Sequence, residues 1–484
     1  MAFGVSRKLS KQALKGHGWL GLAVGVFLYW ICLSGTFAVL GNELIRWEQP
    51  QVTETLNYNP QDLQNAYRRM LQDQGEISTL VTMRLPTPDM PRVFLSANGS
   101  AWYIDETGNL SQEKAHPITD FIAEFHAELH LPHTFGELFV SILGALLTVL
   151  IISGVIAHRR IFKDAFTFRG GADTSQKQAD LHNRLSVWGL PFHLMIALTG
   201  AYFGLGGPLT TLYADAMYDG DKWALFGEVY GEVPDAPSYN GKMDLERALQ
   251  SLKSMAPETQ PLFVTFERPG KNDEFLLLGA QHTDKFIYSE QYRFDAMGNY
   301  LDAVGFADGF AGQEAIFSVY RLHFGHYGSD WVLVSYLILG LALTVICVSG
   351  INIWLRKRPV TDALNDYWAA VVWGTPASFL IAALLSFVFP SIIVPVFWVM
   401  FSAICVYAVR KQQPLKVSRL LQNSTALLLI ALALTSVFFH GWTNTSLAFY
   451  AINGGMVILA LLLSSYFYTE RRDARSGKSP QIKN

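Results

Sequence analysis

Long runs of uncharged, mostly apolar residues are the feature that most constrains how this chain folds. A helix needs about 20 apolar residues to cross the hydrocarbon core of a bilayer. Seven runs approach that size, over residues 18–40, 138–157, 187–208, 331–355, 368–389, 391–409 and 447–468, and a weaker eighth covers 425–439. We therefore expect a mainly α-helical, polytopic membrane protein with about eight transmembrane helices in contact with the lipid bilayer.

Composition and charge agree with this fold class. Only 16% of the 484 residues are charged, against roughly 25% in an ordinary soluble domain. The 37 basic and 40 acidic residues give a net charge of -3, so the chain has no basic field for nucleic acid and we expect no such partner. Cys32, Cys347 and Cys405 lie in apolar runs, which favours packing roles over a disulfide framework.

The basic residues predict the orientation of the chain, because Lys and Arg in short loops and near helix ends stay cytoplasmic. They gather before the first run, after the second and fourth, between the sixth and the weak run, and in the tail. These groups cover residues 7–15, 159–184, 356–358, 410–419 and 471–483. With eight helices, every group falls on the same side, so we expect both termini to be cytoplasmic.

Two long polar stretches, 41–135 and 209–330, would then face the opposite side, and acidic residues outnumber basic ones in both. Each has a helical pattern, three strand-like segments and an Asp-x-x-Gly-Asn turn, which suits a strand reversal. The helical patterns are 61–71 and 244–254, and the strand-like segments are 79–84, 92–97, 101–105, 261–267, 274–280 and 291–295. Each stretch is therefore expected to form a small α+β domain.

These patterns predict the domain organisation of the whole chain. It divides into a cytoplasmic N-terminus with the first helix (1–40), the first outer domain (41–135), two helices with a cytoplasmic loop (136–208), the second outer domain (209–330), the fourth helix (331–358), four C-terminal helices (359–470) and a cytoplasmic tail (471–484).

An internal repeat extends through the first four helices. His17 and His182 open the first and third spans, whereas His130 and His323 precede the second and fourth. A hydroxyl residue followed by glycine recurs in all four spans, as Ser34-Gly35, Ser153-Gly154, Thr199-Gly200 and Ser349-Gly350. The repeated unit is helix, outer domain, helix, and a pseudo-twofold axis along the membrane normal would relate its copies. The small pairs would permit either close helix packing or room for a flat cofactor.

The duplicated histidines are the candidate ligands of a cofactor. Neutral imidazole is a good ligand for haem iron, and a planar macrocycle with two axial imidazoles needs facing histidines at similar depth. His17 and His182 lie at the cytoplasmic ends of their spans, and His130 and His323 lie at the outer ends. The repeat therefore offers one bis-histidine pair at each membrane face, which would make an electron path across the bilayer.

Other histidines leave alternatives open. His133 and His326 follow the outer pair by three residues, a spacing that would also permit a non-haem metal site on a helix. His193 lies three helical turns after His182, without a counterpart in the first span, and would replace a symmetric ligand or assist a proton or electron step. His158 is likewise unmatched. His126 is interpreted as a residue of an amphipathic helix.

These motifs together resemble the PepSY-associated transmembrane helix family, the iron-regulated inner-membrane proteins that include siderophore reductases. The resemblance covers about residues 10–360. It rests on His17-Gly-Trp-Leu-Gly-Leu with Leu-Ser-Gly-Thr, Leu129-His130, Leu181-His182, Leu322-His323-Phe-Gly, the segment from Ser349-Gly350 to Trp354-Leu-Arg-Lys, and the two Asp-x-x-Gly outer domains, which look like PepSY modules.

The resemblance implies a protein of the bacterial inner membrane whose PepSY-like domains are periplasmic. It implies two haem b groups, with the family's helix histidines falling on His17, His130, His182 and His323. Its implied activity is that of a ferric-siderophore reductase, which passes electrons through the haems to a periplasmic ferric siderophore and releases iron as the ferrous ion.

The electron donor is expected to be membrane quinol or a separate reductase. The cytoplasmic loops are each shorter than about 30 residues, which is too short for a Rossmann unit. No Gly-x-Gly-x-x-Gly sequence follows a strand. The chain is therefore not expected to bind a nicotinamide in a domain of its own.

Two further functions compete with electron transfer. One is a non-redox membrane anchor whose PepSY-like modules bind peptides or regulate a protease, although an anchor has no need of histidines at matched depth. The other is a permease that uses residues 359–470. Their apolar runs contain no charged residue, which disfavours a proton- or ion-coupled carrier.

Overall fold

The computed structural model describes residues 6–74, 80–158, 160–166, 174–239, 243–307, 309, 311–442 and 446–475. The chain divides into two compact units. Unit 1 is Met1–Glu48, His116–Leu205 and Gly328–Asn484, and unit 2 is Gln49–Ala115 and Gly206–Tyr327. Parts of the basic groups, at residues 159, 169 and 476–483, lie outside the described residues.

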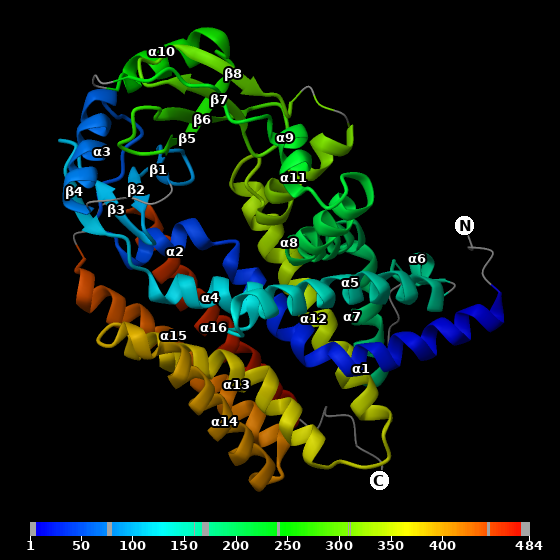
Figure 1. Ribbon diagram of the computed structural model, residues 1–484. Coiled ribbons are helices and arrows are strands. Elements are labelled where there is room, and N and C mark those ends of the chain that lie inside the picture. The colour runs from blue at the N-terminus through cyan, green and yellow to red at the C-terminus, as the bar shows by residue number, and fades with distance from the viewer. Residues whose placement is uncertain are drawn as a thin grey trace. The chain divides into compact units, whose positions relative to one another are not determined.

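Unit 1 is helical. Its elements are α1 (Arg7–Ala38), α2 (Gly41–Glu48), α4 (Pro117–Glu128), α5 (His133–Ala157), α6 (Ile161–Asp164), α7 (Thr174–Trp188), the first part of α8 (Leu190–Met217), α12 (Asp330–Lys357), α13 (Ala363–Ser386), η1 (Pro390–Ile392), α14 (Ile393–Lys411), α15 (Pro414–His440) and α16 (Leu447–Arg475). Figure 1 shows them in colours that run from blue at α1 to red at α16.

Eight helices of the described chain are long and apolar enough to cross a membrane, which confirms the expected number. They are α1, α5, α8, α12, α13, η1 with α14, α15 and the part of α16 up to Ser465. The weak run at 425–439 lies within α15, which begins at Pro414, a residue that suits the first turn because its missing N–H has no intrahelical role there. The protein is therefore a multi-pass membrane protein.

Unit 2 is built on one antiparallel sheet of eight strands in the order β4-β3-β2-β1-β5-β6-β7-β8, drawn in blue to green in Figure 1. The strands are β1 (Leu80–Arg84), β2 (Phe94–Ala97), β3 (Ser100–Ile104), β4 (Leu110–Glu113), β5 (Thr259–Glu267), β6 (Phe275–His282), β7 (Glu290–Asp295) and β8 (Tyr300–Val304). Its helices are α3 (Pro60–Gln74), α9 (Lys222–Tyr230), α10 (Leu245–Met255) and α11 (Ala311–Phe324). Both polar stretches of the sequence therefore supply four strands to a shared sheet.

The parts of the sheet that come from the two polar stretches join through β1 and β5. Thr82 lies opposite Thr265 in this antiparallel pair. The α3 residue Tyr67 stacks on Phe266 of β5 with ring centroids 3.8 Å apart, and both rings belong to a core that also takes in Leu249 of α10. One apolar core thus holds the helices and the strands of both parts.

The Asp-x-x-Gly-Asn segments form the predicted turns. Asp105 Oδ1 accepts hydrogen bonds from the backbone N–H groups of Thr107 and Asn109, both at 2.9 Å. Asp295 holds its own turn in the same way. Gly108 and Gly298 have φ values of 74° and 75°, a region that glycine enters without steric cost. The turns lead into β4 and β8, two strands that the sequence pattern did not indicate.

Helices α13 to α16 are tied to the repeat helices by polar contacts from large aromatic residues. The Tyr29 hydroxyl on α1 donates to the Val372 carbonyl on α13 at 2.6 Å. The Trp30 indole N–H donates to Thr375 Oγ1 at 2.9 Å. In the opposite direction, Trp368 on α13 donates to Asn352 on α12. One apolar core of unit 1 therefore runs through both groups of helices.

Cys32 on α1 and Cys347 on α12 supply a direct test of this packing. Their Sγ atoms lie 3.9 Å apart, and a disulfide needs them at about 2.05 Å, a small approach. We expect mild oxidation in detergent to join the two thiols within one chain, detected by mass spectrometry after proteolysis. Cys405→Ser should leave the cross-link in place, whereas an intact Cys32 thiol under conditions that oxidise Cys347 would contradict this helix pair.

The start of α4 is held by a carboxylate at the end of α2. Glu48 Oε1 accepts from the Ile118 N–H, and Oε2 accepts from the Thr119 N–H, both at 2.8 Å. The Thr119 hydroxyl also donates to Oε2 at 2.5 Å. The first N–H groups of a helix have no intrahelical partner, so Glu48 satisfies two of them and fixes the position of α4 against α2.

Glu48 predicts a pH dependence of stability. Burial raises the pKa of Glu48 to about 7, whereas an unfolded glutamate titrates at about 4.3. The folded state binds this proton more tightly, so the contribution of Glu48 to stability is complete below pH 4.3 and is lost as the pH rises toward about 7. We expect Glu48→Gln to remove on the order of 4 kcal/mol of that decline, measured by thermal unfolding in detergent at several pH values. Identical pH slopes for both proteins would contradict the prediction.

Candidate functional site

The structure brings two of the predicted ligands together. His17 on α1 and His182 on α7 have ring centroids 6.4 Å apart, with ring planes at 84° to each other. His182 is positioned by α7, which ends at Trp188, while α8 begins at Leu190 and continues the predicted third span. The inner histidine pair that the repeat indicated is therefore present within unit 1.

Each histidine of the pair is held through the same ring nitrogen. His17 Nδ1 lies 3.0 Å from the Leu150 carbonyl oxygen and 3.2 Å from Ser153 Oγ, both on α5. His182 Nδ1 lies 3.1 Å from the Ile346 carbonyl oxygen and 3.1 Å from Ser349 Oγ, both on α12. A proton on Nδ1 satisfies the carbonyl, and this tautomer leaves the lone pair on Nε2.

Glycines give these two rings their space. A methyl group added at Gly154 would lie 3.2 Å from His17 Cε1, and one at Gly350 would lie 3.2 Å from His182 Cε1. Gly144 and Gly340 instead permit close helix contact, against Ala201 and Thr36. Gly154 and Gly350 of the hydroxyl-Gly pairs thus lie against histidine rings, whereas Gly144 and Gly340 lie at close helix contacts.

The inner pair lies next to an apolar cluster in the repeat helices. The cluster contains Leu28 and Cys32 of α1, Leu143, Leu147 and Leu150 of α5, Ala197 of α8 and Leu343 of α12. These side chains are nearly or fully shielded from solvent. Neutral imidazole is the form that binds a metal ion.

His193 is placed differently from the pair. It is 2% exposed, its ring rests against Gly189, and its Nε2 atom lies 3.2 Å from the Leu339 carbonyl oxygen on α12. His193 thus uses the opposite nitrogen from His17 and His182. His158 ends α5, with Nε2 3.7 Å from Asp164 Oδ2.

His130 follows α4 in an aromatic surrounding within unit 1. Its side chain is 4% exposed, and Nδ1 lies 3.2 Å from Glu124 Oε2. Phe121 and Phe125 lie beside it, with ring centroids 4.5 and 5.8 Å away. Among the described residues, His130 Nε2 is a buried nitrogen without a hydrogen-bond partner. Leu129 and His130 both have a φ of 54°, a strained backbone of the kind that persists at functional sites.

His133 and His130 contact different carboxylates. His133 begins α5, is 75% exposed in its side chain, and bonds Glu128 at 2.8 Å. His130 instead contacts Glu124. In the described part of the chain, no group of three or more His, Cys, Asp or Glu residues is arranged to hold a metal ion.

His323 and His326 belong to unit 2. His323 lies in the last turn of α11, and His326 follows it, with ring contacts to Tyr320 and Phe324. Arg321, buried on α11, donates from Nε to the His326 carbonyl oxygen at 2.9 Å and fixes this turn. Burial lowers the pKa of His326. Because His130 and His323 belong to different units, their pairing stays a prediction.

His126, which was expected on an amphipathic helix, was not among the predicted ligands. This residue lies on α4, and its Nδ1 atom is 3.0 Å from the Ile31 carbonyl oxygen of α1. A methyl group added at Gly35 would lie 2.5 Å from His126 Cε1. The signal that would have found it is the Ser34-Gly35 pair, which has the same form as Ser153-Gly154.

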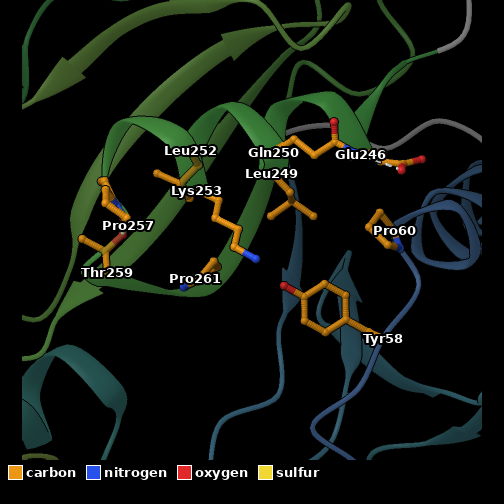
Figure 2. A pocket seen from close by; sticks show the side chains of 11 residues that line it. Tyr58, Pro60, Glu246, Leu249, Gln250, Leu252, Lys253, Pro257, Thr259 and Pro261 are labelled. Atoms are coloured by element: carbon orange, nitrogen blue, oxygen red, sulfur yellow. Dashed lines mark hydrogen bonds between the residues drawn. The ribbon is translucent and has the colours of Figure 1, made fainter.

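Unit 2 also has a groove of about 420 Å³ beside α10. Figure 2 shows Leu249 and Lys253 of α10 facing Tyr58 across it, with Pro60 and Pro261 at its borders. Its lining contains no histidine or cysteine. The groove therefore lacks the nitrogen and sulfur ligands that bind transition metals.

Comparison with known proteins adds a family. Residues 14–357 match the family model described as the PepSY-associated TM region. One relative is an uncharacterized protein of Pseudomonas aeruginosa, 28% identical over 257 residues. The match covers 50% of this chain and 64% of that protein, so the chain spans less than two thirds of its relative's length. Helices α13 to α16 lie beyond the part that the family model matches.

Proposed function

This chain belongs to the family of the PepSY-associated TM region, and from that premise we propose that it is a b-type haem oxidoreductase of the inner membrane. In this proposal it passes electrons across the membrane to a periplasmic ferric siderophore and releases iron. The observation that carries the proposal is the pair of His17 and His182, whose ring centroids are 6.4 Å apart.

The residues of this pair fit an axial ligand set. Two imidazoles on opposite sides of one metal ion, each bound through a bond of about 2 Å, have ring centroids roughly 6 Å apart. Histidines that bind metal usually donate their other ring N–H to a carbonyl or carboxylate. Leu150 and Ile346 accept from His17 and His182 in this way. Gly154 and Gly350 leave the rings room to approach.

The chain's own residues would orient and insulate the cofactor. Bound haem would supply one-electron chemistry, with an iron potential set by its axial ligands and surroundings. His17 and His182 would hold it from α1 and α7, and Leu147, Leu150 and Leu343 would exclude water from that region. His130, with its buried Nε2, and His323 are the proposed ligands of a second haem.

The sheet topology supports the electron donor that we propose. Every strand pair in the described chain is antiparallel, whereas a dinucleotide-binding Rossmann unit needs a parallel sheet. We therefore infer that electrons come from membrane quinol or from a separate reductase. The ferric siderophore as acceptor rests on the family resemblance.

The test is a spectrum followed by a transport assay. The detergent-purified protein should give a b-type α-band in a dithionite-reduced minus oxidised spectrum, with about two haems per chain by pyridine haemochrome. In proteoliposomes with reduced quinol, a ferric trihydroxamate chelate and a ferrous-specific dye should report chelate reduction. Protein from haem-replete cells that carries no haem would overturn the proposal, and haem without chelate reduction would overturn its substrate half.

A further inference from the structure

Three histidines of unit 1 make the same two contacts with a neighbouring helix. In each case the ring rests against a glycine that follows a serine, and Nδ1 lies within 3.1 Å of the carbonyl oxygen four residues before that glycine. The three sets are His17 with Leu150, Ser153 and Gly154; His182 with Ile346, Ser349 and Gly350; and His126 with Ile31, Ser34 and Gly35.

The serine takes part in each set. Ser153 Oγ donates to the Leu150 carbonyl at 3.0 Å, and Ser349 Oγ donates to the Ile346 carbonyl at 3.1 Å. Ser34 Oγ lies 3.2 Å from the Ile31 carbonyl oxygen and closer, at 2.8 Å, to the Trp30 carbonyl oxygen. In all three sets the carbonyl three residues before the serine is also the histidine's acceptor. A carbonyl oxygen has two lone pairs and can accept from both groups. A residue with a Cβ at the glycine position would block the imidazole ring from reaching this carbonyl. The glycine thus leaves this carbonyl oxygen open to one imidazole N–H.

We propose that His126, in place of His130, is a ligand of the second haem, presented by Ser34-Gly35 in the way that Ser153-Gly154 and Ser349-Gly350 present His17 and His182. This inference rests on the proposed haem function and deepens it. A proton on Nδ1, donated to the Ile31 carbonyl, places the His126 lone pair on Nε2, which becomes the ligating atom.

His126 and His130 are only four residues apart in the sequence, but their surroundings differ. His130 contacts the carboxylate of Glu124 and has a left-handed backbone, without a glycine and carbonyl of the kind described above. His126 instead lies within a regular helix whose first turn is fixed by Glu48. Rigid placement on a helix is what a ligand needs to bind a macrocycle in one orientation.

The experiment compares substitutions in the full-length protein purified with its haem. His126→Ala should lower the haem content per chain by about half, or convert half of the low-spin signal to high spin, because one axial ligand is lost. Added imidazole should restore the low-spin spectrum, a rescue that a merely structural histidine would not give. His126→Gln keeps a donor for the Ile31 carbonyl and should show the same loss in a chain of normal stability.

Gly35→Ala and Gly21→Ala form a matched pair on α1. The added methyl group would lie 2.5 Å from His126 Cε1 at Gly35, but 3.8 Å from Leu150 Cδ2 at Gly21, an ordinary contact. Gly35→Ala should therefore reproduce part of the loss, and Gly21→Ala should leave the spectrum unchanged. Wild-type haem content and spectrum in both His126 variants would overturn the inference, whereas a wild-type protein without haem would instead overturn the proposed function.

Discussion

His182→Ala is expected to remove the inner haem, lower the haem content per chain by about half, and slow electron transfer across the membrane by at least about tenfold. The reason is that His17 and His182 face each other with ring centroids 6.4 Å apart, so neither side chain has a second partner ring to take over. Pyridine haemochrome assays and quinol-driven chelate reduction in proteoliposomes measure the two effects.

Two variants control this result. Ser349→Ala removes a hydroxyl 3.1 Å from His182 Nδ1 but leaves the Ile346 carbonyl, so haem should be retained with a shifted midpoint potential. His440→Ala removes a histidine at the end of α15 that packs against Phe387 and Phe449, and it should behave as wild type. Full haem content in His182→Ala would show that the inner pair is not a ligand pair.

Arg92→Ala is expected to cause the largest loss of stability in unit 2. Arg92 is 1% exposed, its Nη2 lies 3.0 Å from Glu54 Oε1, and its guanidinium lies over the Tyr103 ring. Removing one partner of a buried ion pair costs about 3–5 kcal/mol, and the 18% exposure of the Glu54 side chain places the expected loss at the lower end of that range. Hydrogen exchange of β2 and β3 in the full-length protein, together with its thermal unfolding, measures the change.

Arg268→Ala is the matched control for Arg92→Ala. Arg268 pairs with Asp273, but both side chains are more than a third exposed, and exposed pairs contribute about 0–1 kcal/mol. Equal losses from the two substitutions would contradict the view that burial makes the Arg92 pair important.

The sequence predicts the membrane helices well because each must supply its own long apolar run. Even the weak run at 425–439 lies within a complete helix, α15. The α10 pattern and the turns at Asp105 and Asp295 were predictable for a similar reason, since a helical face and a turn are both local signals.

The joining of β1 to β5 was not predictable from local patterns. Strand alternation tells which face of a strand is buried, but it does not name the partner strand. Strands β4 and β8 were missed because they are edge strands with little apolar signal, since no residue of Leu110–Glu113 and only Val304 of Tyr300–Val304 is buried. Helix α4 has 12 residues, too few to appear as a membrane span although its apolar face belongs to the core of unit 1.

The candidate site was partly predictable. The repeat indicated that His17 and His182 belong together, because duplication places the same residue type at equivalent positions. It did not indicate which ring nitrogen is held, nor that Gly35 faces His126, because contacts between helices depend on side-chain direction as well as spacing.

The shared sheet also sets an order for the biosynthesis of the protein. Strand β1 pairs on one side with β2, which follows it closely, and on the other side with β5. At 5–20 residues per second, the roughly 180 residues that separate β1 from β5 take about 10–40 s to synthesise. During that interval the backbone groups on one side of β1 have no strand to pair with, and such an edge is prone to wrong association. The sheet of the first half of the chain is thus an intermediate with one unpaired edge at β1, until the second half is synthesised and supplies β5.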